Sequence, residues 1–411
     1  MVLPYLPRPS KSGGMQSSGS SYRPLRSTGR ILMGPGPSMV HPRVYEALSR
    51  KLDGHLDPEF LAIMNETQEM LREVFATKNR LTISISGTGS AGMEAALVNL
   101  IEPDDEVLVC VNGVFGARMC DITERLGGKL HRIERPWGEV FRVEEIEDAL
   151  KKSPGVKVVA IVNAETSTGA HQPVGEIGRL CRETGRLFVV DAVTSLGGIE
   201  LSVDDWNIDV CYSGTQKCLS CPPGLAPITF GDRAIARLHA RKRKVSSWYL
   251  DMSLIESYWT DGKRAYHHTA PISMNYALHQ ALAVVLEEGL KPRFERHRRN
   301  SLALVKGLEA LGFRLFAAQG HRLPMLNAVW IPEGVDDAKT RRQLLDQFNI
   351  EIGGGLGQVA GKIWRIGLMG ETSTRENVTW FLSALESILY SQGHLKQIGA
   401  GLEAVVQAYA T

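Results

Sequence analysis

The sequence predicts an α/β protein with a large domain on a mostly parallel central sheet, followed by a smaller C-terminal α+β domain. From about residue 80, short β-rich runs alternate with helical patterns, as in strands joined by crossover helices. The run 158–162 is apolar at every position, which is typical of a strand covered on both faces. A chain of 411 residues is also too long for one ordinary core.

The first thirty residues are expected to form a disordered extension. They are mainly Ser, Gly, Pro and Arg with almost no apolar periodicity, so they cannot bury enough surface to become ordered. Their basic residues, without any acid, also resemble a mitochondrial transit peptide, although a clear amphipathic helix is missing. Residues 1–30 are therefore assigned to the extension, 31–289 to the large domain and 290–411 to the small domain.

The expected strands of the large domain lie at 81–86, 106–111, 156–163, 187–193, 210–213 and 227–230. A helix is expected at 273–289. It leads into a basic stretch at 291–299, which is interpreted as the solvated face of an interdomain helix. In the small domain, helices near 300–311 and 374–390 are separated by short strands at 313–316, 328–331, around 351 and at 363–366.

Composition argues against polyanionic and membrane partners. Lys and Arg number 47 and Asp and Glu 45, so the net charge of +2 gives no field that would hold nucleic acid or an anionic membrane. No uninterrupted apolar run approaches the ~20 residues of a membrane helix. We therefore expect neither nucleic acid nor a membrane as a partner.

The six cysteines are too few and too scattered for a disulfide framework, which favours a reducing compartment. Residues 409–411 do not resemble a peroxisomal address, so the cytosol is the expected location, with the mitochondrion as the alternative. Cys218 and Cys221 have the spacing of a redox or zinc pair, but no second pair accompanies them. No metal site is predicted.

A glycine-rich turn at 86–92, Ser-Gly-Thr-Gly-Ser-Ala-Gly, separates an apolar strand from a helical stretch at 93–100. Such a turn directs free amides and the positive end of the helix at one point, which suits a phosphate. It is neither a Walker loop nor a complete dinucleotide fingerprint. Taken alone, the turn is a weak signal, and a plain connection between a strand and a helix is the more common explanation.

Two charged residues follow further strands. Asp191 ends the apolar run 187–190, at the edge of a parallel sheet where ligands bind, although a helix cap or a salt bridge would also explain it. Lys217 follows the short strand at 210–213 and would ordinarily be a solvated surface charge. Near apolar neighbours its pKa would fall, making it a nucleophile toward carbonyls. A phosphate cup, an acid and a lysine in this order fit pyridoxal 5′-phosphate.

The chain resembles the class V aminotransferases of fold type I, and within them the alanine:glyoxylate, serine:glyoxylate and ureidoglycine:glyoxylate enzymes. The resemblance runs from about residue 31 to beyond residue 385. It rests on segments at 34–38 (Gly-Pro-Gly-Pro-Ser), 86–92, 165–169 (Glu-Thr-Ser-Thr-Gly), 191–193, 213–217, 266–269 (Tyr-His-His-Thr) and 361–367 (Gly-Lys-Ile-Trp-Arg-Ile-Gly).

The resemblance implies a set of cofactor contacts. Lys217 would form the Schiff base with pyridoxal 5′-phosphate, and Asp191 would pair with the pyridine nitrogen. The phosphate would be surrounded by Thr88, Gly89, Ser90 and Gln216. Phe115 stands where the family stacks an aromatic ring on the cofactor, and Thr166 aligns with a hydroxyl residue near the phenolic oxygen.

The resemblance also implies a shared active site and a substrate clamp. Tyr266 and Thr269 would reach the phosphate of the neighbouring subunit, which makes a homodimer part of the site. Arg365 would bind the substrate α-carboxylate, because a planar guanidinium can meet both oxygens in a fixed orientation. The loop 34–37, with Gly36, would close over the substrate.

The expected activity is transfer of an amino group from a small amino acid, alanine or serine, to glyoxylate by a ping-pong cycle. Two alternatives remain open: a ureidoglycine:glyoxylate aminotransferase and a lyase of the same fold. Tyr266 stands where ureidoglycine enzymes use asparagine, which favours the small donor. A cysteine desulfurase would need a mobile cysteine in the second domain, and no cysteine lies beyond Cys221.

Overall fold

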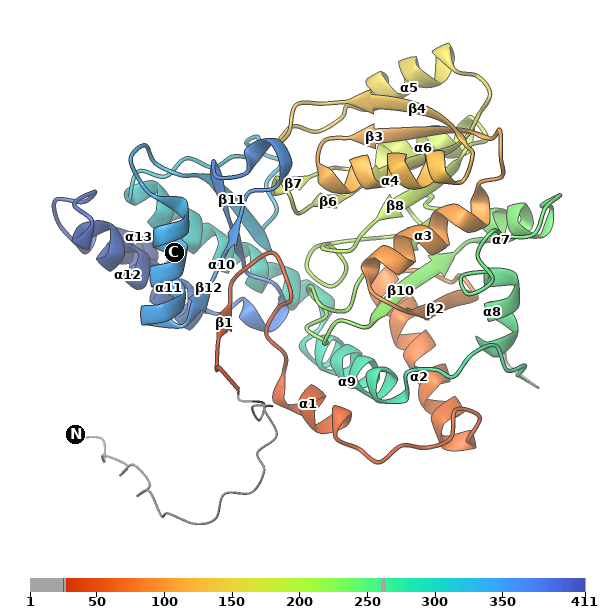
Figure 1. The fold of residues 1–411 in the computed structure, drawn as a ribbon, viewed down its shortest axis with the longest axis horizontal. Coiled ribbons are helices and arrows are strands. Elements are labelled where there is room, and N and C mark those ends of the chain that lie inside the picture. The colour runs from red at the N-terminus through yellow and green to blue at the C-terminus, as the bar shows by residue number, and fades with distance from the viewer. Residues whose placement is uncertain (1–24, 26, 260–263, 411) are drawn as a thin grey trace, which may run out of the picture.

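The computed structural model describes residue 25, residues 27–259 and residues 264–410. The expected disordered extension, residues 1–30, lies mostly outside this part of the chain. Figure 1 shows two lobes, with the residues after about 290 forming the cyan-to-blue lobe on the left. Across the ranges 27–259 and 264–410, no helix is both long and apolar enough to span a bilayer.

The large lobe is built on a seven-stranded sheet with strand order β2-β10-β9-β8-β5-β3-β4. Only β10 runs antiparallel to its neighbours, and the other pairings are parallel, so the expected mostly parallel sheet is confirmed. The strands are β2 (Leu81–Ser86), β3 (Glu106–Val111), β4 (Lys129–Glu134), β5 (Val156–Val162), β8 (Leu187–Asp191), β9 (Val210–Tyr212) and β10 (Leu225–Phe230).

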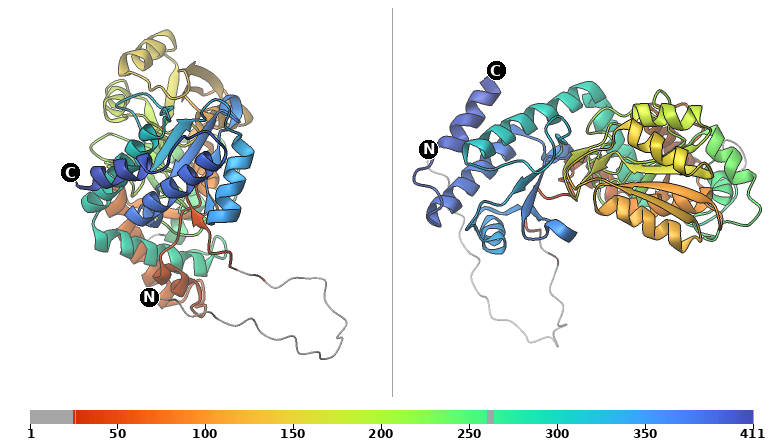
Figure 2. Two further views of the ribbon diagram at one scale, coloured as in Figure 1. Left: turned by 90° about the vertical axis from the view of Figure 1, so that its left-hand side faces the viewer. Right: turned by 90° about the horizontal axis from the view of Figure 1, so that it is seen from above.

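Both faces of this sheet are covered, which explains the continuous apolar runs. Along β5, Val158 and Ala160 belong to one core cluster, whereas Val159 and Ile161 belong to another on the opposite face. The right-hand view of Figure 2 shows helices on either side of the strands. These helices are α1 (Pro42–Leu48), α2 (Pro58–Phe75), α3 (Gly89–Leu100), α4 (Val114–Arg125), α5 (Val143–Lys152), α6 (Gly175–Glu183), α7 (Asp232–His239), α8 (Met252–Trp259) and α9 (Ile272–Glu288).

The sequence analysis missed strand β4 because that strand lies at the edge of the sheet. Its residues, Lys-Leu-His-Arg-Ile-Glu, are exposed or half-buried throughout, so they lack the apolar run of a covered strand. A short hairpin also went unpredicted, formed by β6 (Ala164–Glu165) and β7 (Ala170–His171). The strand expected at 313–316 is wrong, since only the isolated bridge between Leu315 and Val329 forms there.

The second lobe has a three-stranded antiparallel sheet and its own apolar core. The sheet consists of β11 (Leu326–Trp330), β14 (Ile363–Gly367) and β13 (Gly353–Gly354), packed with α10 (Leu290–Ala310), α11 (Asp337–Phe348), α12 (Arg375–Ser391) and α13 (Ala400–Ala410). Near the other end of the chain, β1 (Ile31–Leu32) pairs with β12 (Ile350–Glu351), and Met33 joins this core. Residues 31–33 thus pack with the small lobe, although the sequence analysis grouped them with the large domain.

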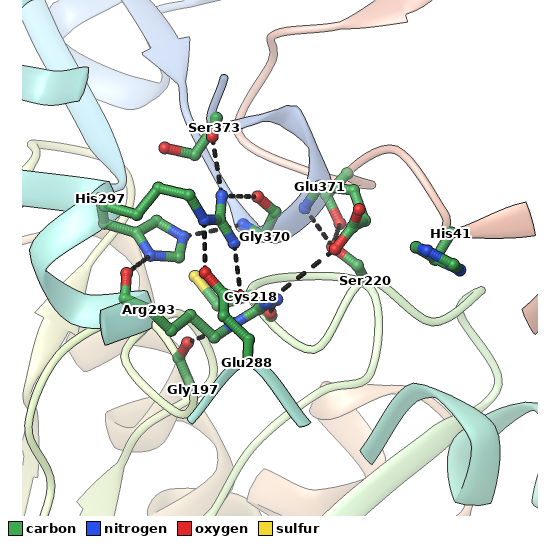
Figure 3. A network of polar contacts seen from close by, with 12 residues as sticks. His41, Gly197, Cys218, Ser220, Glu288, Arg293, His297, Gly370, Glu371 and Ser373 are labelled. Carbon is green, nitrogen blue, oxygen red and sulfur yellow. Dashed lines mark hydrogen bonds and ion pairs between the residues drawn. The ribbon is translucent and has the colours of Figure 1, made fainter. Parts of the chain in front are cut away.

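The basic stretch 291–299 is not simply a solvated face, and that interpretation is corrected. Arg293 on α10 is fully buried. Its guanidinium donates hydrogen bonds to the carbonyl oxygens of Gly197 at 3.1 Å and Cys218 at 2.7 Å, and it pairs with Glu288 at 2.5 Å (Figure 3). The high number of charged residues in this stretch did not reveal that one side of α10 is buried. A helix of this length has both an inner and an outer face.

His297, one turn further along α10, extends the same network into the small lobe. Its Nδ1–H donates to the Arg293 carbonyl at 2.8 Å, so Nε2 accepts from the backbone N–H of Gly370 at 2.9 Å (Figure 3). Burial and the neighbouring arginines lower the pKa of His297 to about 3, which keeps the ring neutral. The network therefore ties α10 both to the Lys217–Ser220 turn and to the turn that follows β14.

We expect the substitution Arg293→Met to destabilise the fold by about 3–5 kcal/mol, because it leaves buried hydrogen-bond acceptors without their charged donor. Urea unfolding of the purified variant measures this. The control is Arg298→Met on the same helix, whose exposed ion pair with Glu295 contributes little. Equal stability of the two variants would contradict the structural role of Arg293.

Candidate active site

The carboxyl edge of the central sheet gathers most of the residues singled out in the sequence. Thr88 follows β2, Phe115 follows β3, Thr166 follows β5, and Asp191 ends β8. Lys217 follows β9. Because these strands run in the same direction, their ends meet at one edge, where ligands bind in open α/β sheets.

The glycine-rich turn forms a cup at the start of α3. Thr88 is the N-cap residue, but its side chain does not cap the helix, so amides of the first turn remain available to a ligand. Gly89 lies close to Gly214 and Val193. A Cβ added to Gly89 would be 3.6 Å from Gly214 Cα and 3.2 Å from Val193 Cγ2. The Gln216 side chain lies beside Gly214. Its Oε1 atom is 2.8 Å from the position that a Cβ on Gly214 would occupy.

Phe115 is connected to this cup and is held by a buried acid. Arg118 donates to the Ser90 hydroxyl at 3.0 Å, and its guanidinium lies 5.0 Å from the centre of the Phe115 ring. The Glu165 carboxylate accepts the Phe115 N–H at 3.1 Å. Burial raises the pKa of Glu165, and hydrogen bonds from Ser167, Phe115 and Gly116 oppose that effect. Glu165 thereby fixes the first turn of α4.

Asp191 is fully buried between strand ends and accepts two hydrogen bonds. Val193 N–H donates to Oδ1 and the Tyr212 hydroxyl donates to Oδ2, each at 2.9 Å. Burial raises the pKa of the carboxyl to about 7 despite these donors. A carboxylate in such surroundings gains strongly from a cationic hydrogen-bond donor, so the site favours a ligand that presents one.

Lys217 projects into the same region, against the N-terminal loop. Its amine donates to the carbonyl oxygen of Pro35. Gly36 has a positive φ of +109°, and a Cβ there would lie 2.6 Å from the lysine nitrogen. Burial, with a smaller contribution from Arg365, lowers the pKa of Lys217 to about 8. A small fraction of the amine is therefore uncharged near neutral pH.

Arg365 on β14 reaches across from the small lobe to this site. Its Nε donates to the Gly354 carbonyl at 2.8 Å and Nη1 to the Thr166 carbonyl at 3.3 Å. Burial lowers its pKa to about 10, while Glu165 opposes that shift. The side chain of Pro35 packs on Gly353, so one loop contacts both the lysine and the strand beside the arginine.

Tyr266 and Thr269 lie apart from the residues above. Their hydroxyls are 3.3 Å from each other, and the Tyr266 side chain is exposed. The same segment is attached to the end of β2, where His268 Nε2 lies 2.8 Å from the Ser86 hydroxyl. Within one chain, both residues are therefore exposed at the surface.

The residues present fit pyridoxal 5′-phosphate. Thr88, Gly89 and Ser90 offer helix N-terminal amides to a phosphate, and Asp191 offers a buried carboxylate to a protonated pyridine nitrogen. Lys217 offers an amine with a lowered pKa. Among the described residues, the Oε1 atom of Gln216 is one of the buried polar atoms without a hydrogen-bond partner, so this side chain has bonding capacity left for a ligand.

Sequence reasoning did not assign roles to Glu165 and Tyr212, although both are buried at this edge. The pattern that identified Asp191, an acid following an apolar strand, also applies to Glu165. No local pattern marks Tyr212, because its contact with Asp191 joins neighbouring strands about twenty residues apart.

Comparison with known proteins agrees with this geometry. The model of the aminotransferase class-V family matches residues 35–379. The chain is 44% identical over 408 residues to an (S)-ureidoglycine–glyoxylate transaminase of Bacillus subtilis (strain 168), covering 95% of this chain and 98% of the relative.

Solved structures agree as well. The crystal structure of the ureidoglycine-glyoxylate aminotransferase from Bacillus subtilis superposes with a TM-score of 0.92 and 46% identity, covering 95% of this chain and 100% of the other. An alanine–glyoxylate aminotransferase from Nostoc sp. gives a TM-score of 0.88 and 49% identity, covering 90% and 98%. The chain therefore belongs to the class V aminotransferases, enzymes of fold type I that depend on pyridoxal 5′-phosphate.

Proposed function

We propose that this aminotransferase moves the amino group of a small amino acid, alanine or serine, to glyoxylate, giving glycine and an oxo acid. The proposal is supported by the contact between the Lys217 amine and the Pro35–Gly36 loop. The same loop also contacts the strand beside Arg365. One pocket thus contains an amine that can accept and donate a proton and a cation that can bind a carboxylate.

Each residue of the site has its own role in the proposed reaction. Pyridoxal 5′-phosphate supplies the electron sink for amino-group transfer when bound. Lys217 would hold the cofactor through its amine, and the same amine, when uncharged, would take a proton from the substrate Cα and return it as general base and acid. Asp191 keeps the pyridine nitrogen protonated. Phe115 would support the ring, and Thr88, Gly89, Ser90 and Gln216 would hold the phosphate, with Thr166 near the phenolic oxygen.

A small donor suits the surroundings of Arg365. A Cβ on Gly353 would lie 3.6 Å from Arg365 Nη2, and the Gly354 carbonyl accepts a hydrogen bond from Arg365 Nε. Because both positions are glycine, neither offers a side chain that could pair with a larger donor. A ureido group would need paired polar partners, because buried donors and acceptors without partners reject a ligand. Tyr266, rather than asparagine, occupies the position that the resemblance assigns to recognition of such a group.

The second candidate is ureidoglycine as the donor, and the similarity to the Bacillus subtilis enzyme favours it. Identity does not separate the two candidates, since the structure of the alanine–glyoxylate enzyme from Nostoc sp. is 49% identical and that of the ureidoglycine enzyme 46%. The glycines at 353 and 354 beside Arg365 and the tyrosine at position 266 are therefore the basis for preferring the small donor.

The proposal includes a homodimer in which Tyr266 and Thr269 contact the phosphate of the neighbouring subunit. Their exposure supports it, as do two further exposed aromatic side chains that pack on the neighbouring histidines. Trp248 is 62%, Tyr266 59% and Tyr249 43% exposed, and the rings of Trp248 and Tyr249 contact His267 and His268. We also propose the cytosol as the compartment. The six cysteines are buried and unpaired, as expected in a reducing environment.

Half-reactions with single donors test the proposed substrate. Alanine or serine, mixed with the purified enzyme carrying its cofactor, should bleach the visible absorbance of the Lys217-linked form faster than ureidoglycine does. Glyoxylate should then restore that absorbance. The variant Lys217→Ala should show neither change. Faster bleaching by ureidoglycine would overturn the donor assignment, and a Lys217→Ala variant that still transaminates would overturn the catalytic role of the lysine.

The substitution Arg365→Lys should lower kcat/KM for the amino donor by roughly 10- to 100-fold, because an ammonium cannot make the paired hydrogen bonds of a guanidinium. Steady-state kinetics at varied donor concentration measure this. The control is Arg341→Lys, since Arg341 lies beside Gly354 but pairs with Asp337. Equal effects of the two substitutions would contradict the carboxylate clamp.

The buried acid should make the stability of the cofactor-free protein depend on pH. The pKa of Asp191 is raised to about 7, so the folded state keeps a proton that the unfolded chain releases near its ordinary pKa of about 3.9. The stabilising contribution is full below that lower value and is lost as the pH rises toward 7. Urea unfolding between pH 5 and pH 7 should therefore show wild type losing stability relative to Asp191→Asn, by up to about 1.4 kcal/mol per pH unit. A constant difference between the two proteins would contradict the raised pKa.

A further inference from the structure

Tyr212 has a position in the fold that the proposed catalytic roles do not explain. It is the last residue of β9, and Asp191 is the last residue of the neighbouring strand β8. The two strands are parallel and in register, with Asp191 directly opposite Tyr212. Their side chains therefore leave the same edge of the sheet side by side.

The hydroxyl of Tyr212 is fully buried, and its hydrogen bond goes to the acid. It donates to Asp191 Oδ2 at 2.9 Å, while the backbone N–H of Val193 donates to Oδ1. Phenylalanine would fill nearly the same volume without placing a polar group in the interior, where a hydroxyl is costly unless it is paired. The hydroxyl is thus accounted for by its bond to the carboxylate.

Tyr212 is also fixed from its other side, by the helix that begins at the phosphate cup. A Cβ added to Gly92 of α3 would lie 3.3 Å from Tyr212 Cβ and 3.5 Å from its ring. The close approach of α3 leaves the ring no room to swing away from Asp191. One tyrosine therefore contacts both the helix that would hold the phosphate and the acid that would hold the opposite end of the cofactor.

We propose that Tyr212 is a positioning residue that aims Asp191 at the pyridine nitrogen of pyridoxal 5′-phosphate and favours its ionised form. The inference rests on the proposed role of Asp191. One hydrogen bond on each oxygen fixes the carboxylate plane and leaves further lone pairs free for a cationic N–H. A carboxylate held in this way loses less freedom when the cofactor binds.

The charged and titratable groups around Asp191 show which of its neighbours affect the protonation of this carboxyl, and the Tyr212 hydroxyl is one of them. Burial, and after it the negative charge of Glu165, raise the pKa of Asp191, whereas Val193 N–H, the Tyr212 hydroxyl and the Lys217 ammonium lower it. The thiol of Cys211, next to Tyr212, stays protonated because burial and Asp191 raise its pKa. Tyr212 is the side chain that donates a hydrogen bond directly to the acid.

The test compares two cofactors in the full-length enzyme. The first is pyridoxal 5′-phosphate, and the second is its 1-deaza analogue, in which carbon replaces the pyridine nitrogen. Tyr212→Phe should weaken binding of pyridoxal 5′-phosphate by about tenfold, the effect of losing one hydrogen bond to a charged group. Binding of the deaza analogue should change much less, because that ring has no nitrogen for Asp191 to meet. Equilibrium dialysis against each cofactor measures both constants.

The matched control is Tyr276→Phe, which removes another tyrosine–aspartate hydrogen bond, from Tyr276 to Asp53 at 2.5 Å, at a different place in the fold. This variant should bind both cofactors as wild type does. As a second readout, the ¹⁵N chemical shift of labelled pyridoxal 5′-phosphate should move toward the unprotonated value in Tyr212→Phe alone.

Two results would overturn the inference. Equal weakening of both cofactors in Tyr212→Phe would mean that the tyrosine only supports packing, and unchanged binding with an unchanged ¹⁵N shift would mean that it has no influence on Asp191. Failure of the proposed function looks different. In that case wild type itself would not distinguish pyridoxal 5′-phosphate from the deaza analogue.

Discussion

A carboxylate buried at the end of a parallel strand is the constraint on which the site depends. Asp191 lies where the sheet is covered on both faces, so water cannot solvate its charge, and burial raises its pKa to about 7. Two hydrogen bonds compensate only part of that cost. The position therefore favours a ligand with a cationic nitrogen, and the cofactor of this family provides one at its pyridine ring.

The same burial accounts for the properties of Lys217. Removal from water lowers the pKa of its amine to about 8, and the nearby charge of Arg365 acts in the same direction. Arg365 is itself poorly solvated, with a pKa lowered to about 10. An amine that is partly neutral beside a cation that remains charged suits an enzyme that binds a carboxylate and moves a proton in the same pocket.

The junction between the lobes determines how these groups meet. Arg293 holds the Cys218 carbonyl next to Lys217, and His297 holds the Gly370 turn that follows the Arg365 strand. Ser38 adds a third connection, because its hydroxyl donates to the Lys217 carbonyl at 2.7 Å. Segments from the N-terminal loop, the large lobe and the small lobe are thereby joined around the lysine by buried hydrogen bonds, which are strong where water is excluded.

The sequence alone predicted the mostly parallel sheet and singled out the glycine-rich turn, Asp191 and Lys217, because apolar runs, glycine turns and charges at strand ends are local patterns. Only the tertiary structure decided that β4 pairs at an exposed edge, that Arg293 points inward, that Glu165 holds Phe115, and that Tyr212 holds Asp191. These contacts join residues far apart in the chain, so no local period records them. The placement of Tyr266 and Thr269 beside a neighbouring subunit stays a prediction, since a single chain holds only half of such a contact.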